Sequence, residues 1–368
     1  MVNGSNELIL AINLGSTSTK IAVYQGEKRL HSKNFSYTAE QIGSFKNIFE
    51  QKPLRQSGIE EFLKSVNVDI SKFDAVVSRG GALPPHKTGA YMINDLMLDY
   101  LENKASVLHA ACLGPSIAKY FADKSSCDAY IYDGPHSNEM RPVARVTGLQ
   151  GVYRKTVVHV LNGRACIIKY AKSIGKQMSD INVVVAHLGG GISISAYEKG
   201  ILVDCINDKE GPISPERAGR LANEDVILYY DSSGCTKQEM LKLLRGRGGF
   251  VSLLETNSAL EVEKQIAEGN EKAKIVYDTM CYQTAKCIGE MSVALKGNVD
   301  AIIMTGNIAH SNMVVNAISE YVKHIAPIEI MPGEFEMEAL SLGVLRVIRG
   351  EEICNEFTQA TIDNQFKI

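Results

Sequence analysis

The stretch ELILAINLGSTSTKIAVYQGEKR, residues 7–29, decides the fold. Two short aliphatic runs enclose a turn rich in Ser and Thr, which predicts a β-hairpin. Gly15 lets the backbone approach an anion closely, and the hydroxyl groups and Lys20 could donate to phosphate oxygens. Ordinary turns favour the same residues for backbone reasons, so this stretch alone leaves both interpretations open.

A second copy of the pattern lies at residues 181–204, INVVVAHLGGGISISAYEKGILVD. At a constant offset, Asn13 matches His187 and Gly15 matches Gly189. Repetition at half the chain length indicates duplication, because solenoid repeats have periods of roughly 20 to 50 residues. We therefore expect two related α/β units whose turns grip a nucleotide across a cleft.

The composition excludes several classes of protein. The 368 residues suit two domains, and 39 Lys and Arg against 42 Asp and Glu provide no global field for nucleic acid or a membrane. The eight cysteines contain no C-x-x-C pair, which argues against zinc and a disulfide framework. P-loop, G-x-G-x-x-G, G-x-S-x-G and H-E-x-x-H motifs are absent from the sequence. With no export signal or membrane span in the sequence, we expect a cytoplasmic protein that binds a small molecule.

Charged residues lie at the ends of predicted strands and in a rigid loop. Arg79 follows one strand beside two glycines, and Asp133 follows another. Each could face a ligand, although a solvated arginine and a turn-starting aspartate are ordinary alternatives. The loop 208–217, DKEGPISPER, ends at Arg217, and its prolines would hold a phosphate-binding arginine in place.

Helical periodicity predicts a long helix over 154–178 and a helix over 105–123 that is interrupted at Gly114. Gly306 lies between a predicted strand and a helix, a usual place for a nucleotide. The alternating acids in 334–338 could supply a magnesium ligand or simply form an acidic first helical turn.

Taken together, these segments resemble the butyrate kinases of the acetate kinase family, within the actin/sugar-kinase/Hsp70-like superfamily. The matching segments are INLGSTSTKIAVY, VVSRGGALPPHKTGAYMIN, DGPHSNEMRPVARVTG, AHLGGGISISAYEKG, EGPISPERAG, VDAIIMTGNIAHS and PGEFEMEALSLGVLRVIRGEE. The resemblance implies two duplicated ribonuclease-H-like domains around a nucleotide cleft, formed by 1–135 plus 340–368 and by 136–339. It also implies ATP, ADP and Mg²⁺ as ligands, a short-chain or branched carboxylic acid as the phosphoryl acceptor, and a homodimer.

The resemblance assigns roles to residues of this chain. Phosphate and substrate contacts fall on Asn13, Ser16, Ser18, Lys20 and His109. Catalytic roles fall on Arg79, Asp133, His159, His187 and Arg217. Nucleotide contacts fall on Gly189, Gly190, Gly191, Gly306 and Asn307. The magnesium side falls on Glu336, with Glu334 as neighbour, and on Asp133.

The chain departs from the family pattern around these residues. Leu14 replaces a proline and Asn307 a glycine, while His136 and Ser137 make the wall after Asp133 more polar. Two alternatives therefore stay open beside a butyrate kinase. One is the same reaction on a different acid. The other is a catalytically weak regulator that binds a nucleotide or an acyl phosphate.

Overall fold

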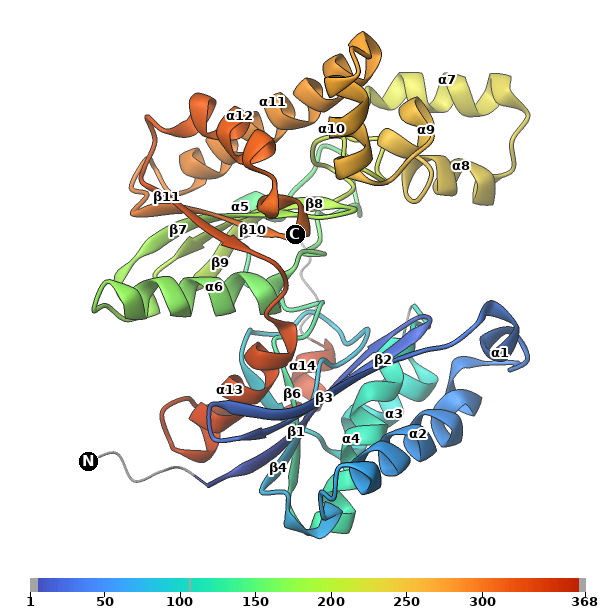
Figure 1. Ribbon diagram of the computed structural model, residues 1–368, viewed down its shortest axis with the longest axis vertical. Coiled ribbons are helices and arrows are strands. Elements are labelled where there is room, and N and C mark those ends of the chain that lie inside the picture. The colour runs from blue at the N-terminus through green and yellow to red at the C-terminus, as the bar shows by residue number, and fades with distance from the viewer. Residues whose placement is uncertain (1–5, 106, 364–368) are drawn as a thin grey trace. The chain divides into compact units, whose positions relative to one another are not determined.

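The computed structural model describes residues 6–105 and 107–363 (Figure 1). Its contacts divide the chain into two compact units. The first contains the described parts of Met1–Asn138 and Phe335–Ile368 together with Val160–Asn162. The second contains Glu139–His159 and Gly163–Glu334. Each unit has its own sheet.

The first unit has a seven-stranded sheet in the order β12-β5-β6-β4-β1-β2-β3. Its strands are β1 (Leu8–Gly15), β2 (Ser18–Gln25), β3 (Lys28–Ser36), β4 (Ala75–Ser78), β5 (Ala90–Met92), β6 (Asp128–Tyr132) and β12 (Cys354–Asn355). Its helices are α1 (Ala39–Gly43), α2 (Lys52–Ser65), α3 (Asp95–Asn103), α4 (Gly114–Ser125), α13 (Glu336–Ile348) and α14 (Gln359–Asp363). Figure 1 shows α13 and α4 on opposite faces of this sheet, which explains why β1 is continuously aliphatic instead of alternating.

The second unit has a five-stranded sheet in the order β11-β10-β7-β8-β9. Its strands are β7 (Asn182–Leu188), β8 (Ile192–Glu198), β9 (Ile201–Ile206), β10 (Ala301–Gly306) and β11 (Ile328–Pro332). Its helices are α5 (Pro142–Arg145), α7 (Asn223–Ser233), α8 (Lys237–Leu244), α9 (Phe250–Leu254), α10 (Ala259–Ala267), α11 (Glu271–Ala294), α12 (Asn312–Val322) and most of α6 (Val160–Ser173). Figure 1 shows α11 and α12 on one face of the sheet and α6 on the other.

The two units are related by duplication. The order β6-β4-β1-β2-β3 in the first sheet corresponds strand for strand to β11-β10-β7-β8-β9 in the second. In both, the first hairpin is antiparallel and the strand added on its other side is parallel. The register irregularity in the second hairpin also recurs, between Val23 and Tyr24 and between Ala196 and Tyr197. The structure therefore confirms the predicted repeat.

Two helix predictions were wrong in their bounds. The predicted helix 154–178 is replaced by the shorter α6, because the chain before it is irregular and enters the helix from a non-helical His159. The predicted break at Gly114 is instead the start of α4, where Pro115 occupies the first turn. Proline is tolerated there because its missing N–H has no intrahelical partner to lose.

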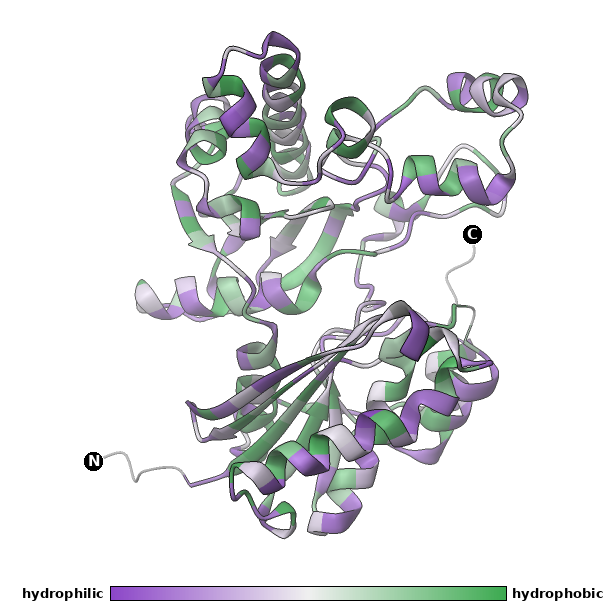
Figure 2. Cartoon of the chain, turned by 45° about the vertical axis from the view of Figure 1, so that its right-hand side comes forward, coloured by the Kyte–Doolittle hydropathy of each residue, from purple (hydrophilic) through white to green (hydrophobic). Residues whose placement is uncertain are grey.

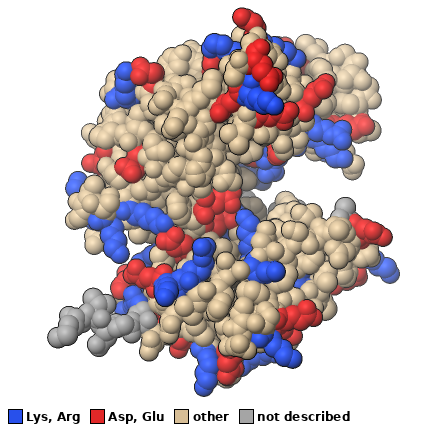
Figure 3. Space-filling view, in the orientation of Figure 1, with Lys and Arg blue, Asp and Glu red and all other residues tan. Residues whose placement is uncertain are grey.

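Figure 2 shows apolar residues concentrated along the strands of each sheet, while the helices carry mixed colours that fit one buried and one exposed face. On the face drawn in Figure 3, basic and acidic side chains are interspersed. Among the described helices, none combines the length and hydrophobicity of a membrane span.

Candidate functional site

The turn between β1 and β2, residues 15–18, is tied to helix α2. Gly15 pairs with Ser18 at the end of the β1–β2 hairpin, and Ser16 and Thr17 are exposed at its tip. Arg55, which is fully buried, donates to the carbonyl oxygens of Gly15 at 3.3 Å, Ser16 at 3.1 Å and Ser18 at 2.8 Å. The conformation of the turn thus depends on a side chain that is remote in sequence.

Three predicted residues meet beside this turn. The Asn13 side-chain amide donates to Glu336 Oε2 at 2.5 Å, and Arg79 Nη1 lies 3.2 Å from Glu336 Oε1. Asn13 is buried, whereas the Arg79 and Glu336 side chains keep 26% and 14% exposure. A guanidinium group with that exposure can still reach a bound anion.

His109 is fixed by contacts at both ring nitrogens. Its Nδ1 accepts from the Ala111 amide at 3.1 Å, and Nε2 lies 3.1 Å from Ser16 Oγ. Because Nδ1 is an acceptor, the neutral ring carries its proton on Nε2 and donates it to Ser16. His109 therefore orients a hydroxyl group at the tip of the turn.

Asp133 follows β6 in an uncommon conformation. Its φ is 44°, in the left-handed region, and its side chain is buried. Asp133 Oδ1 accepts from the Gly89 amide at 2.8 Å, and the Asp133 amide donates to the Gly89 carbonyl at 3.1 Å. Backbone strain held in place by such contacts is common at functional sites.

The polar residues that follow Asp133 are bonded within the first unit. Ser137 Oγ lies 3.3 Å from His86 Nε2, and His136 Nδ1 lies 3.0 Å from the Leu83 carbonyl. Burial lowers the pKa of His86 to about 4, so that ring is neutral near neutral pH. These contacts lessen the polarity that the sequence suggested for this wall.

In the second unit, two predicted histidines stack. The ring centroids of His159 and His187 are 3.7 Å apart with an interplanar angle of 10°. His159 Nδ1 lies 3.1 Å from Ser193 Oγ, and His187 sits near the end of β7. Stacking fixes both ring planes at the mouth of the second glycine turn.

The glycine turn 189–191 is packed against the loop that carries Arg217. The Ser214 hydroxyl and the Glu216 amide both donate to the Gly190 carbonyl, at 2.8 and 3.0 Å. A Cβ atom on Gly191 would lie 3.0 Å from the Asp208 side chain and 3.3 Å from Arg217 Nε. A larger residue at position 191 would require the Asp208 side chain to shift by a few tenths of an ångström.

Arg217 forms ion pairs with acidic side chains. Its Nε donates to Asp208 Oδ2 at 2.8 Å, and Nη1 lies 3.4 Å from Glu216 Oε2. Arg245 Nε lies 3.4 Å from the same Asp208 oxygen. Asp208 has a side-chain exposure of 7%, and its Oδ1 finds no hydrogen-bond partner among the described residues.

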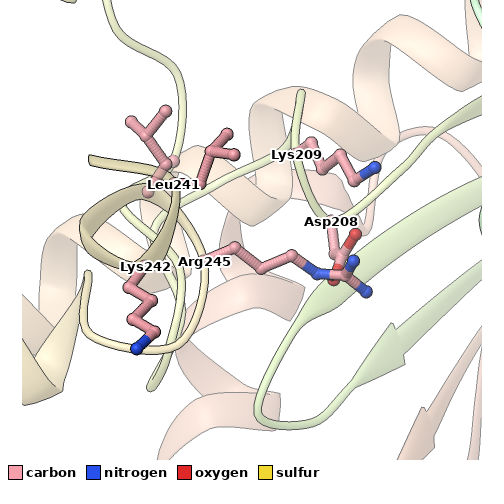
Figure 4. Close-up of a pocket in the computed structure, with 7 residues that line it drawn as sticks. Asp208, Lys209, Leu241, Lys242 and Arg245 are labelled. Carbon is pink, nitrogen blue, oxygen red and sulfur yellow. The ribbon is translucent and has the colours of Figure 1, made fainter. Parts of the chain in front are cut away.

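A pocket of about 500 Å³ opens beside Asp208. Figure 4 shows Arg245 extended across it with its guanidinium group against the Asp208 carboxylate. The lining residues are Asp208, Lys209, Gly219, Leu241, Lys242, Leu244 and Arg245. The pocket belongs to the second unit and is connected to Arg217 through Asp208.

Gly306 ends β10 with φ of +88°, and a Cβ atom there would lie 2.3 Å from the Leu188 carbonyl oxygen. Backbone hydrogen bonds join it to Gly333 in both directions, at 3.0 and 3.2 Å. Asn307 is exposed directly after it. This glycine allows β10 and β7 to end side by side.

The fold thus collects the predicted residues in two groups. The first unit holds Asn13, Ser16, Ser18, Lys20, Arg79, His109, Asp133 and Glu336. The second holds His159, His187, Gly189, Gly190, Gly191, Arg217, Gly306 and Asn307. Sequence reasoning missed Arg55, for which no motif exists, and Asp208, which opens the proline loop and could have been suspected as a partner for Arg217.

Two sheets of one topology, each with a glycine turn after its first strand, define the class. The chain superimposes on acetate kinase from Porphyromonas gingivalis with a TM-score of 0.77 at 15% identity, covering 92% of this chain and 99% of that one. A propionate kinase from Francisella tularensis gives 0.74 at 18% identity, covering 91% and 98%. The fold is therefore the duplicated, actin-like fold of the acetate and propionate kinases.

Sequence comparison identifies the family. The Acetokinase family pattern matches residues 129–333. Butyrate kinase 2 of Clostridium acetobutylicum is 42% identical over 351 residues, which is 95% of this chain and 99% of that protein. The chain belongs to the acetokinase family.

Proposed function

We propose that the protein is a carboxylate kinase that transfers the γ-phosphoryl group of ATP reversibly to butyrate or a similar short-chain acid. The products are an acyl phosphate and ADP. The observation that carries the proposal is the 42% identity to a butyrate kinase over 95% of the chain. Arg79, Asp133, Arg217 and Glu336 are present together with this identity.

The chemistry suits these residues. A carboxylic acid is ionised at neutral pH, so its oxygen can attack the γ-phosphorus without a base while the bond to the ADP oxygen breaks. The main obstacle is bringing two anions together in line. Arg79 and Arg217 would offset that repulsion and stabilise charge on the equatorial oxygens, and each such group is often worth about 3–4 kcal/mol.

His109 would orient the substrates through the Ser16 hydroxyl that it contacts, and His159 and His187 through their stacked rings. The first turn, with Asn13, Ser16, Ser18 and Lys20, would bind the transferred phosphoryl group. The glycine turn 189–191 and Gly306 would seat the nucleotide, because glycine lets the backbone approach phosphates and ribose.

Magnesium would arrive with ATP. Among the described residues, no group of three or more His, Cys, Asp or Glu side chains is arranged to hold a metal. Mg²⁺ on a nucleotide keeps several waters and needs only one or two carboxylates, so Glu336 and Asp133 fit that need. When bound, the ion would neutralise phosphate charge during transfer.

The assembly is proposed to be a homodimer. Helix α7 has no buried residue along its length, and Ile227, Leu228, Tyr229 and Tyr230 are 42% to 66% exposed. These four consecutive residues surround the helix, and an exposed apolar band of this kind is unusual on a free surface. Acidic α7 and basic α8 would complement each other across a two-fold axis. The eight free cysteines fit the proposed cytoplasmic location.

The direct test is ADP release with Mg-ATP and acids from acetate to hexanoate, including branched ones, with acyl phosphate trapped by hydroxylamine. We expect hydroxamate with at least one acid, and a loss in kcat/KM of about 100-fold or more in Arg217→Ala. Arg220→Ala, which removes an exposed arginine paired with Glu290, should retain activity. No hydroxamate with any acid, despite saturable ATP binding, would overturn the proposal in favour of a binding regulator.

A further inference from the structure

Arg55 is a buried cation without a carboxylate partner. Its side chain is fully buried, and none of the described acidic residues forms an ion pair with it. Its hydrogen bonds go to three turn carbonyls, to Thr19 Oγ1 at 2.9 Å, and to Gln51 Oε1 at 2.9 and 3.3 Å. All of these acceptors are neutral, so the positive charge is solvated but not neutralised.

Burying a charge is costly, and a counter-charge normally accompanies it. Arg346, a half-buried arginine of the same unit, follows that rule, since its Nε lies 3.0 Å from Glu352 Oε2. Arg55 also lies in the first turn of the 14-residue helix α2, where no acidic residue is present and the helix dipole is positive. The guanidinium group of Arg55 and the positive end of the α2 dipole thus both lie behind the turn 15–18.

The turn directs its amides away from Arg55. In a trans peptide the C=O of one residue and the N–H of the next point in opposite directions. Because the Gly15 and Ser16 carbonyls face Arg55, the Ser16 and Thr17 N–H groups face the other way, where both residues are exposed. Consecutive amides of this kind bind anions.

We infer that Arg55 is the fixed counter-charge for a phosphoryl group bound at the turn 15–18, and that it also positions the amides that hold this group. The inference rests on the proposed function for the place of the phosphoryl group. The guanidinium group acts through the turn, with no contact to the substrate, so Arg55 is a positioning residue.

Gln51→Glu tests the inference without removing Arg55. Gln51 is 4% exposed and already accepts two hydrogen bonds from Arg55, so a glutamate of the same shape would supply an internal counter-charge. We expect the free protein to gain roughly 3 °C in Tm, and the affinity for inorganic phosphate, measured by calorimetry, to fall about tenfold or more. A purely structural role for Arg55 predicts no loss of affinity.

Three further variants make the test specific. Gln25→Glu adds the same charge at the far end of β2, about 23 Å along the strand, and should bind phosphate as the wild type does. Arg55→Met should lose affinity for inorganic phosphate. Arg346→Met should destabilise the fold but bind phosphate with wild-type affinity. Wild-type phosphate affinity in Gln51→Glu, or no phosphate binding by the wild type, overturns the inference.

The hydroxylamine assay separates this outcome from the fate of the proposed function. Phosphate binding that depends on Arg55, together with no hydroxamate, would refute the kinase activity but support Arg55 as the counter-charge. Hydroxamate formation with an unchanged KM for acyl phosphate in Gln51→Glu would support the kinase and refute the role of Arg55 as a counter-charge. In an active enzyme we expect that KM to rise about tenfold while the KM for ADP stays within about twofold.

Discussion

Arg217 can meet a substrate anion only with the nitrogens that its protein partners leave available. Asp208 occupies Nε, and Glu216 lies near Nη1. Arg245 also pairs with Asp208, so the two arginines and the two carboxylates of this cluster balance in charge. Holding the guanidinium by Nε and Nη1 leaves Nη2 for a phosphoryl oxygen, a division of donors that arginine offers and lysine does not.

Asp208→Asn should therefore act through Arg217. It keeps the size of the side chain but removes the charge, which would let Arg217 turn toward Glu216. We expect kcat to fall about 10- to 100-fold, as for a misplacement of about 1 Å. In an Arg217→Lys background the same substitution should have little further effect, because lysine lacks Nε–H; steady-state kinetics of the four proteins measure this coupling. Additive losses would show that Asp208 acts elsewhere, and Asp204→Asn, at another arginine pair of the unit, is the additive control.

At the residue scale, sequence patterns reveal side chains whose chemistry is displayed next to a motif. Arg79, Arg217 and Glu336 could be nominated because they adjoin glycines, prolines or a helix start. Arg55 could not, since its partners Gly15 and Ser18 are about forty residues away in the chain and only tertiary packing brings them together. The roles assigned by resemblance remain proposals.

Among the secondary-structure elements, the hairpins could be predicted from the local sequence pattern, whereas the start of helix α6 could not. The β1–β2 and β7–β8 hairpins form between neighbouring apolar runs, so local pattern suffices. Thr236 and Glu239 form a capping box at the start of α8, and that signal is local too. The start of α6 depends on how its preceding segment packs, which periodicity does not record.

A substitution at Gly306 tests whether β10 and β7 can end side by side only with glycine at this position. In Gly306→Ala the new Cβ would clash with the Leu188 carbonyl, in addition to the strain of a positive φ. We expect a loss of about 2–4 kcal/mol in the free energy of unfolding, with faster hydrogen exchange along both strands. Gly297→Ala is the matched control, because it has φ of +76° and no atom within 4 Å of the new Cβ, and should cost only about 1 kcal/mol. Equal losses in the two variants would contradict the steric argument.

For the whole molecule, the proposed homodimer depends on α7. Charge supports a second copy as its partner, since α7 carries Glu224, Asp225 and Asp231, and α8 carries Lys237 and Lys242 against the single acid Glu239. In a two-fold interface each helix would meet the other's opposite charge while exposed apolar residues of α7 are covered.

Replacing Ile227 and Leu228 together by Asp should abolish the dimer, because two carboxylates would be buried without partners. Light scattering coupled to size exclusion should then show the mass of one chain, 40.2 kDa, whereas we expect twice that mass for the wild type. Val293→Asp changes a side chain of the same unit that is 75% exposed and should leave the dimer intact. A monomeric wild type would refute the dimer. A dimeric double variant would instead exclude α7 as the contact, because no two-fold interface tolerates four unpaired carboxylates at its centre.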